Sequence, residues 1–375
     1  MRKVCVLELF SNKRVQSFRF IREQEVDLLI DSISDSSVSS SPVDLNEKLL
    51  SLISSITCRT AFGKKFQGNE FDEGNFEEVF HEAVAVVGAF TASDFLPRVG
   101  WIIDRLTGFQ GRLEKIFHHL DVFYQKVIDQ HLNTKHEEDQ HDILAVLLKL
   151  VEISQTEYGE VQFTQDHVKA ILMNIYLAGV ESSSTAITWA MAHLIKEPRV
   201  MKKVQEEIRN CIGNKGKVTE ADIEQLKYLK MVVKETLRLN PPGPLLLPRE
   251  TLSHFKINGY DIYPKTQLFV NIWAIGRDPD SWKFPEEFIP ERFEDGSIDY
   301  KGQNFVFFPF GAGRRGCPGM NLGLTMVELA LANLLYCFDW KLPNGMKEED
   351  VDMEEMAGIV LYKKFPLKLV PVRGQ

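Results

Sequence analysis

The sequence contains few cysteines and no excess of positive charge, and both deficits exclude classes of protein. Five cysteines stand among 375 residues, at positions 5, 58, 211, 317 and 337. Their odd number and wide spacing provide no CxxC pair, which indicates a reducing compartment and excludes a disulfide framework or a cysteine zinc site. Lys and Arg number 44 against 53 Asp and Glu. A protein that follows nucleic-acid phosphates needs a basic surface, so that class is excluded.

Long hydrophobic runs are also missing. No window supplies the roughly eighteen uncharged apolar residues that a membrane-spanning helix requires, and the apolar stretch at residues 4–10 is interrupted by Glu8. We therefore expect neither a membrane anchor nor a signal peptide. Glycine and proline, at 24 and 16 residues, are too few for a collagen-like or linker composition. The hydrophobic content of 44% is enough for a large packed core.

Helical periodicity covers most of the chain, because apolar residues recur three and four positions apart in several segments. These segments are residues 76–90, 113–132, 168–194, 201–212 and 320–335. Two polar segments predict solvated loops, namely residues 32–41, with seven serines, and residues 134–141, rich in charge and histidine. We expect a mainly α fold.

The composition changes after residue 240. Residues 241–309 are rich in proline, glycine and aromatics, and they predict long ordered loops. Short strands are expected at residues 254–257, 267–272, 338–342 and 359–364. No flexible linker separates the helix-rich part, 1–240, from the mixed loop and strand part, 241–375, so we expect a single domain over 1–375.

The most informative segment is residues 307–319, with the sequence FFPFGAGRRGCPG, which we name the cysteine loop. Four glycines and two prolines constrain it. Cys317 stands just ahead of a predicted helix N-terminus and beside two arginines, where positive potential favours the thiolate, the form that binds iron or attacks an electrophile. A buried thiol in an ordinary loop is the alternative, and this setting argues against it.

The cysteine loop also contains GxGxxG between Gly311 and Gly316, which on its own is a dinucleotide-binding signature. Pro309 and Pro318 interrupt the strand-to-helix turn that such a site needs, and too little chain follows for further βαβ units. A second glycine-containing segment, GNKGKVT at residues 213–219, has the wrong spacing for a P-loop and predicts a turn between helices.

Written as FxxGxRxCxG, the cysteine loop matches at Phe310, Gly313, Arg315, Cys317 and Gly319, and it resembles the haem-binding signature of the cytochrome P450 superfamily. Three further motifs occur in the family's order. They are AGVESS at 178–183, ETLR at 235–238 and PERF at 290–293, which resemble the motif of helix I, the ExxR of helix K and the plant-type PERF. The resemblance covers essentially the whole chain and is closest to the plant A-type group of family 71. It implies the cytochrome P450 fold, with small β-sheets in the C-terminal half.

The resemblance implies heme b, iron protoporphyrin IX, as the cofactor. Cys317 would be the axial ligand of its iron. Gly313 and Gly319 would let the backbone approach the porphyrin, and Phe310 would pack on the ligand side of the ring. The propionates need cations, and the family pattern assigns three arginines to them, namely Arg2, Arg249 and Arg315.

The ExxR motif places Glu235 and Arg238 three residues apart on a helix, where an exposed pair would contribute only about 0.2–0.5 kcal/mol. The resemblance implies instead a buried triad in which Arg292 joins them and braces the cysteine loop. Loss of one member is then expected to prevent haem incorporation.

At the position of the family's oxygen-activating acid and threonine, the chain has Glu181 and Ser182. Serine keeps the hydroxyl but loses the methyl group that restricts χ1, and glutamate keeps the carboxylate on a longer stem. We expect a proton relay that is less preorganised. A polar patch that bonds to its own helix carbonyls is the alternative. Family position also implies four substrate walls, namely Ala178, Leu245, Leu246 and Ile359.

The resemblance thus implies a haem-thiolate monooxygenase of plant secondary metabolism. It would insert one oxygen atom from O2 into a small apolar metabolite, with NADPH electrons from NADPH-cytochrome P450 reductase, at the cytosolic face of the endoplasmic reticulum membrane. Two alternatives stay open: an isomerase or dehydratase without efficient oxygen activation, and a non-catalytic pseudoenzyme.

One departure from the family pattern motivates the pseudoenzyme alternative. The chain begins inside the family's helix C, where Arg2 matches WxxxR without its tryptophan. The family's anchor, helices A and B and most of its first sheet would precede this point, so we expect an N-terminally truncated P450 fold with part of the haem pocket open.

Overall fold

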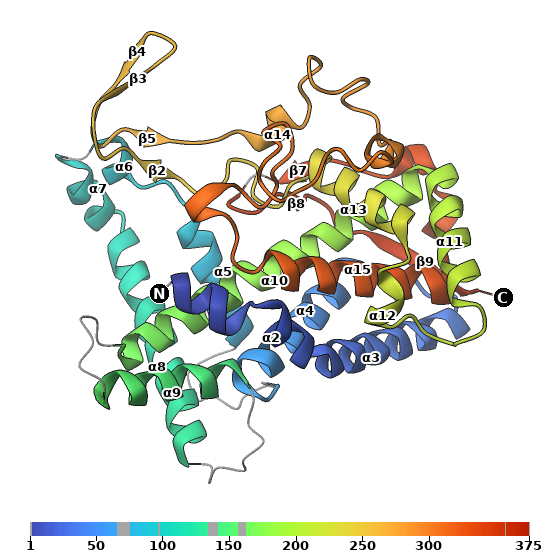
Figure 1. Cartoon of the computed structure of the whole chain (residues 1–375), viewed down its shortest axis with the longest axis horizontal. Helices are drawn as coiled ribbons and strands as arrows, with labels where there is room; N and C mark the ends of the chain where they lie inside the picture. The colour runs from blue at the N-terminus through green and yellow to red at the C-terminus, as the bar shows by residue number, and fades with distance from the viewer. Residues whose placement is uncertain are drawn as a thin grey trace. The chain divides into compact units, whose positions relative to one another are not determined.

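The computed structural model describes residues 2–65, 76–96, 98–133, 142–156, 163–356 and 358–374 (Figure 1). These residues form two compact units. Unit 1 comprises Met1–Leu28, Leu50–Glu181 and Asn321–Gly323, and unit 2 comprises Leu29–Leu49, Ser182–Met320 and Leu324–Gln375. The expected single domain, with its change of character at residue 240, stays a prediction. The loop expected at 134–141 lies outside the described residues.

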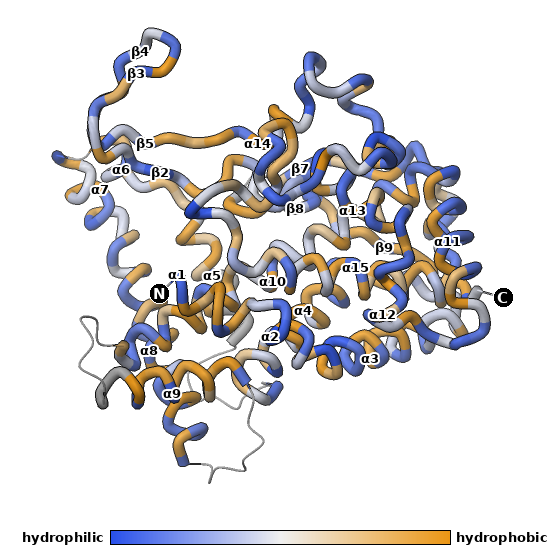
Figure 2. Tube along the Cα trace, in the orientation of Figure 1, coloured by the Kyte–Doolittle hydropathy of each residue, from blue (hydrophilic) through white to orange (hydrophobic). Residues whose placement is uncertain are grey.

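The described part of unit 1 consists of helices and connecting turns. Its elements are α1 (Arg2–Val4), η1 (Cys5–Leu9), α2 (Asn12–Ser17), α5 (Phe76–Val87), α6 (Ala92–Phe95), α7 (Gly100–Leu106), α8 (Phe109–Asn133) and α9 (Ile143–Thr156), with parts of α3 (Arg19–Val38), α4 (Leu45–Phe62) and α10 (Gln165–Lys196). Figure 2 shows α9 as a largely hydrophobic helix.

Aromatic rings form much of the core of unit 1. The ring centroids of Phe80 and Tyr176 lie 4.2 Å apart, and those of Phe62 and Phe123 lie 6.3 Å apart in an edge-to-face arrangement. All four residues are buried. Large buried rings of this kind contribute strongly to core energetics, and here they join α4, α5, α8 and the first half of α10.

Unit 2 combines helices with small antiparallel sheets. Its helices and turns are α11 (Pro198–Ile212), α12 (Glu220–Ile223), α13 (Lys227–Leu239), α14 (Ile272–Ile275), η2 (Pro290–Phe293), η3 (Gly313–Arg315), α15 (Met320–Cys337), η4 (Pro343–Gly345) and η5 (Glu348–Asp350). Three strands pair in the order β1 (Val43–Asp44), β9 (Lys368–Arg373), β6 (Phe338–Lys341). Two-stranded pairs are β2 (Arg249–Glu250) with β5 (Gln267–Leu268), β3 (Phe255–Ile257) with β4 (Tyr260–Ile262), and β7 (Glu355–Met356) with β8 (Tyr362–Lys363). The predicted mainly α fold is confirmed.

Helix α15 corrects the expectation that no segment is long and apolar enough to span a membrane. Among the described residues it is the one helix long and apolar enough to do so, with a mean hydropathy of 1.3 over 18 residues that include the charged Glu328. Since 61% of this stretch is buried within the protein, α15 has the surroundings of a core helix. Near its end, Gln205 Nε2 donates to the Phe338 carbonyl at 3.0 Å, which fixes α11 against the turn into β6.

The loop predicted at residues 32–41 is wrong for most of its length, because α3 continues to Val38. The serine hydroxyls bond to helix carbonyls: Ser34 Oγ donates to Ile30 O at 2.9 Å, and Ser37 Oγ donates to Ser34 O at 2.9 Å. Serine that bonds back in this way is compatible with a helix. Ile33, which is fully buried, supplies the packing that composition did not reveal.

Two predicted strands are shorter than expected. The strand expected at 267–272 ends at Leu268, because Asn271 Oδ1 accepts a hydrogen bond from Ala274 N at 2.9 Å and starts α14. Of the strand expected at 359–364, only Tyr362–Lys363 pairs, with β7. The strand expected at 254–257 is confirmed as β3, Phe255–Ile257, which pairs with β4.

Candidate functional site

The core of the candidate site is an ion pair buried on α13. Arg238 Nε donates to Glu235 Oε2 at 2.7 Å, and its Nη2 donates to Glu235 Oε1 at 2.8 Å. Both side chains are 0% exposed. The three-residue spacing places them on one helix face, and the guanidinium fork meets the carboxylate in a bidentate geometry that lysine does not offer.

Arg292, from η2, joins this pair. Its Nε donates to Glu235 Oε1 at 3.1 Å, and the backbone N–H of Ile289 donates to the same oxygen at 2.8 Å. The structure thus brings together the three residues expected to form a triad. One carboxylate lies between two guanidinium groups, so its removal leaves two largely buried cations without their common counter-ion.

The two arginines also hold a length of irregular chain between residues 276 and 287. Arg238 donates to the carbonyls of Gly276 at 2.5 Å, Pro285 at 2.6 Å and Glu287 at 3.0 Å. Arg292 donates to the carbonyls of Lys283, Phe284 and Glu287. Buried carbonyls need partners, and here side-chain donors replace the ladder of a helix or a strand.

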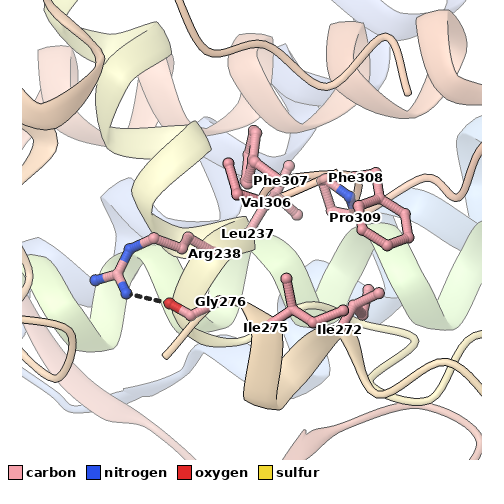
Figure 3. A pocket seen from close by; sticks show the side chains of 9 residues that line it. All are labelled: Leu237, Arg238, Ile272, Ile275, Gly276, Val306, Phe307, Phe308 and Pro309. Atoms are coloured by element: carbon pink, nitrogen blue, oxygen red, sulfur yellow. Dashed lines mark hydrogen bonds between the residues drawn. The ribbon is translucent and has the colours of Figure 1, made fainter. Parts of the chain in front are cut away.

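A small, mostly apolar pocket lies beside Arg238, as Figure 3 shows. It is lined by Leu237, Arg238, Ile272, Ile275, Gly276, Val306, Phe307, Phe308 and Pro309. In the figure the Arg238 guanidinium points toward the Gly276 carbonyl. The lining includes residues 306–309, so the pocket connects α13 with the start of the cysteine loop and contains none of the four expected substrate walls.

The cysteine loop turns tightly back on itself and contains the exposed residue Cys317. The backbone N–H of Cys317 donates to the Phe310 carbonyl at 2.8 Å, and that of Gly311 donates to Phe308 at 2.8 Å. Gly311 and Gly313 have φ of 69° and 65°, which explains the glycines there. Cys317 is exposed and stands three residues before the start of α15. Residues 301–310 form turns and loops, so the strand that a dinucleotide fold requires before GxGxxG is not present there.

The residues around the cysteine loop indicate whether a flat ligand such as haem fits beside it. A Cβ atom on Gly311 would lie 3.8 Å from Leu246 Cδ1, so Leu246 borders the loop. A Cβ atom on Gly319 would meet nothing within 4 Å, and its φ of −92° suits any residue. No protein contact described here requires glycine at 319, whereas close approach of a ring would. The exposed Cys317, the open backbone at Gly319 and the apolar neighbour Leu246 fit a haem.

The three arginines that were predicted to bind the propionates do not all lie in the same unit. Arg315 is exposed in η3 and Arg249 is half-buried on β2, both in unit 2, while Arg2 is exposed in α1 of unit 1. Phe310 is half-buried, and its ring centroid lies 5.9 Å from that of Tyr300 in an edge-to-face arrangement.

The predicted proton-relay residues lie side by side on α10. Glu181 is buried at 7% exposure and Ser182 is half-buried. Thr188 Oγ1, further along, donates to the Ser184 carbonyl at 3.0 Å, so part of the following polar stretch does bond to its own helix. Of the expected substrate walls, Ala178 and Leu245 are exposed, while Leu246 and Ile359 are half-buried.

Sequence reasoning missed a second polar group in unit 2. His193 Nε2 lies 2.6 Å from Asn240 Oδ1, and Asn240 Nδ2 donates to Glu355 Oε1 at 2.7 Å. Burial lowers the pKa of His193 to about 4, so its ring is neutral near pH 7. In the sequence, the only sign of this polar group is that Asn240 stands between a helix end and two prolines.

Several known proteins are similar to this chain in sequence or in fold. The family model described as Cytochrome P450 matches residues 1–369. Cytochrome P450 71B37 of Arabidopsis thaliana is 53% identical over 371 residues, which cover 99% of this chain and 74% of that protein. Cytochrome P450 71B9 of the same plant is 54% identical over 373 residues, with coverage of 100% and 74%. A solved zebrafish cytochrome P450 with progesterone has a TM-score of 0.78 and 25% identity, and the match covers 99% of this chain and 80% of that one.

Proposed function

Because the chain belongs to the cytochrome P450 family, whose members are haem-containing monooxygenases, we propose that it inserts one oxygen atom from O2 into a small apolar molecule. NADPH-cytochrome P450 reductase is the proposed electron source. The observation that carries the proposal is the exposed Cys317, three residues before the start of α15, in a loop that suits a flat ligand.

In this proposal the chain's own residues divide the work. Haem, when bound, supplies the chemistry of oxygen activation. Cys317 holds the iron, and Gly313, Gly319 and Phe310 admit and pack the ring. The triad on α13 and η2 braces the cysteine loop indirectly, because it orders the irregular chain at 276–287, where the Trp282 ring contacts that of Phe307.

Charge and proton movements are assigned to named side chains. The proposed propionate cations are Arg2, Arg249 and Arg315. The proposed proton relay uses the Glu181 carboxyl and the Ser182 hydroxyl, which belong to consecutive residues of α10. Carboxyl and hydroxyl groups can both accept and donate protons, as a relay requires. Ala178, Leu245, Leu246 and Ile359 are the proposed apolar walls that orient the substrate and exclude water.

The test is haem binding with a matched cysteine control. We expect the purified protein to carry haem, and its reduced, CO-bound form to show the absorption band of a thiolate ligand. Cys317→Ser is expected to lose that band, while Cys211→Ser, which changes a half-buried thiol elsewhere in unit 2, is expected to keep it. Wild-type protein without haem supports the pseudoenzyme alternative, and a thiolate band in Cys317→Ser contradicts the assignment of the ligand.

The altered pair Glu181 and Ser182 favours one further candidate, an isomerase or dehydratase that needs no efficient oxygen activation. Turnover without NADPH distinguishes it from the monooxygenase, since an isomerisation consumes no reductant. For the location we propose, on the family alone, the cytosolic face of the endoplasmic reticulum membrane, and fractionation against microsomal markers tests this.

A further inference from the structure

One carboxylate in unit 2 collects hydrogen bonds from two segments that are distant in the sequence. Glu355, in β7, accepts from Asn240 Nδ2 at 2.7 Å and from Trp273 Nε1 at 3.1 Å. Arg277 Nη2 lies 3.6 Å from the same carboxylate, and its guanidinium covers the Trp273 ring at 4.0 Å. The end of α13, the start of α14 and the β7–β8 hairpin therefore meet at Glu355.

The hydrogens in this network have one consistent arrangement. His193 is neutral, buried and stacked on Phe288 with ring centroids 4.5 Å apart and 5° between their planes. With Asn240 Oδ1 at 2.6 Å, its Nε2 carries the hydrogen and donates it. The Asn240 amide is then oriented with its NH2 toward Glu355, which must accept. An ionised carboxylate accepts hydrogen bonds from both Asn240 and Trp273, and its charge faces the Arg277 cation. A glutamine amide has one acceptor oxygen and no charge, so it replaces neither interaction fully.

Backbone hydrogen bonds connect the same segments next to the proposed substrate walls. Leu361 N, two residues from Ile359, donates to Pro242 O at 3.0 Å. Val270 N, three residues from Trp273, donates to Leu245 O at 3.3 Å. The relative positions of Ile359 and Leu245 are therefore fixed by the chain that Glu355 holds together.

We propose that Glu355 and Asn240 are positioning residues, which set the shape of the substrate pocket by holding the hairpin of Ile359 against the segment of Leu245 and Leu246. The inference rests on the proposed function, because these walls contact substrate only if the chain has the family's pocket. Without the carboxylate, Asn240, Trp273 and Arg277 lose their common partner, so the hairpin is held less firmly and keeps only its other contacts, such as Leu361 N to Pro242 O. A bulky ligand then loses a preorganised wall, while a small ligand does not need it.

The experiment compares Glu355→Gln with Glu354→Gln in haem-loaded protein. Glu354 is the adjacent residue, and it is exposed and paired with Lys364 instead. Imidazole and 4-phenylimidazole, which both bind haem iron through nitrogen and differ in bulk, are titrated by absorption. We expect the Kd of 4-phenylimidazole to rise about tenfold in Glu355→Gln, the scale of one lost hydrogen bond to a charged group. The Kd of imidazole is expected to change less than about twofold. Glu354→Gln is expected to resemble the wild type with both probes.

A second variant and a haem-independent measurement keep the test decisive. Trp273→Phe removes the indole donor but keeps a ring beside Arg277, so a smaller rise in the same direction is expected. Tryptophan fluorescence of Glu355→Gln without haem is expected to change, because the Trp273 indole loses its acceptor.

The possible outcomes separate the two proposals. Equal weakening of both probes, or of neither, overturns the positioning role. Loss of haem by both variants also overturns it, because the network is then needed for the fold and not for the pocket. A wild-type chain that binds no haem or gives no response to imidazole contradicts the proposed function itself, whereas a normal wild-type response with unaltered variants contradicts the positioning role alone.

Discussion

Glu328, on α15, is expected to make the stability of the protein depend on pH near neutrality. The residue is 8% exposed. Burial raises the pKa of its carboxyl from 4.5 to about 7, and the opposing attraction of Lys230 and Lys234 on α13 is smaller. The folded protein therefore keeps this carboxyl neutral in a range where the unfolded chain has ionised it.

The sign of the effect follows from proton binding. Between pH 4.5 and about 7 the folded state binds more protons than the unfolded state at Glu328, so the free energy of unfolding falls as the pH rises. Its contribution is complete below pH 4.5 and is lost above about pH 7. A pKa raised from 4.5 to about 7 corresponds to about 3 kcal/mol, at about 1.36 kcal/mol per pH unit.

Urea unfolding of wild type and Glu328→Gln at pH 5 and pH 8 measures this contribution. Glutamine cannot ionise, so the variant is expected to gain up to about 3 kcal/mol relative to wild type between the two values of pH. Glu349→Gln is the control, because that side chain is 75% exposed, and it is expected to follow the wild type. If wild type and Glu328→Gln lose stability in parallel, burial does not hold this carboxyl neutral and the reasoning is refuted.

Three other substitutions test the site. Glu235→Ala leaves both guanidinium groups of the triad without their carboxylate, at a cost of about 3–5 kcal/mol, and is expected to abolish haem incorporation; a normal haem content contradicts this. Ser182→Thr restricts the hydroxyl and is expected to raise product formed per NADPH consumed, so equal coupling in both proteins argues against a loose relay. Gly302→Ala puts a Cβ 3.0 Å from a carbonyl of the cysteine loop at a φ of +76°. It is expected to lower the Tm more than Gly296→Ala, whose φ is +70° in open space, and equal losses would show that the close contact is unimportant.

The parts of the site that lie within local motifs were predictable from the sequence. Glu235 and Arg238 share a helix face, and the resemblance supplied Arg292, 57 residues away from Glu235. Cys317 was placed ahead of a helix by glycine, proline and apolar periodicity alone. These features are local, so spacing and composition carry them.

The remaining features depend on contacts that no local pattern encodes. Asn240 and Glu355 are 115 residues apart, and nothing in the sequence around either residue indicates that they are partners. The helix at residues 32–38 was missed because propensity favours a loop for serine, while the buried Ile33 and back-bonded hydroxyls decide the outcome. The Asn240–Glu355 contact and the helix at residues 32–38 were both decided by tertiary contacts and not by local sequence preference.

The hydrogen bonds from Arg238 and Arg292 to the chain at 276–287 affect which residues of that segment can be substituted during evolution. Each hydrogen bond that the two arginines make to that stretch ends on a backbone carbonyl, and a carbonyl is the same whichever residue carries it. The exposed side chain of Glu287 can therefore change without removing the hydrogen bonds that its own carbonyl accepts. Arg238 and Arg292 themselves cannot be substituted in this way. The path of this irregular segment therefore depends on two residues that lie outside it.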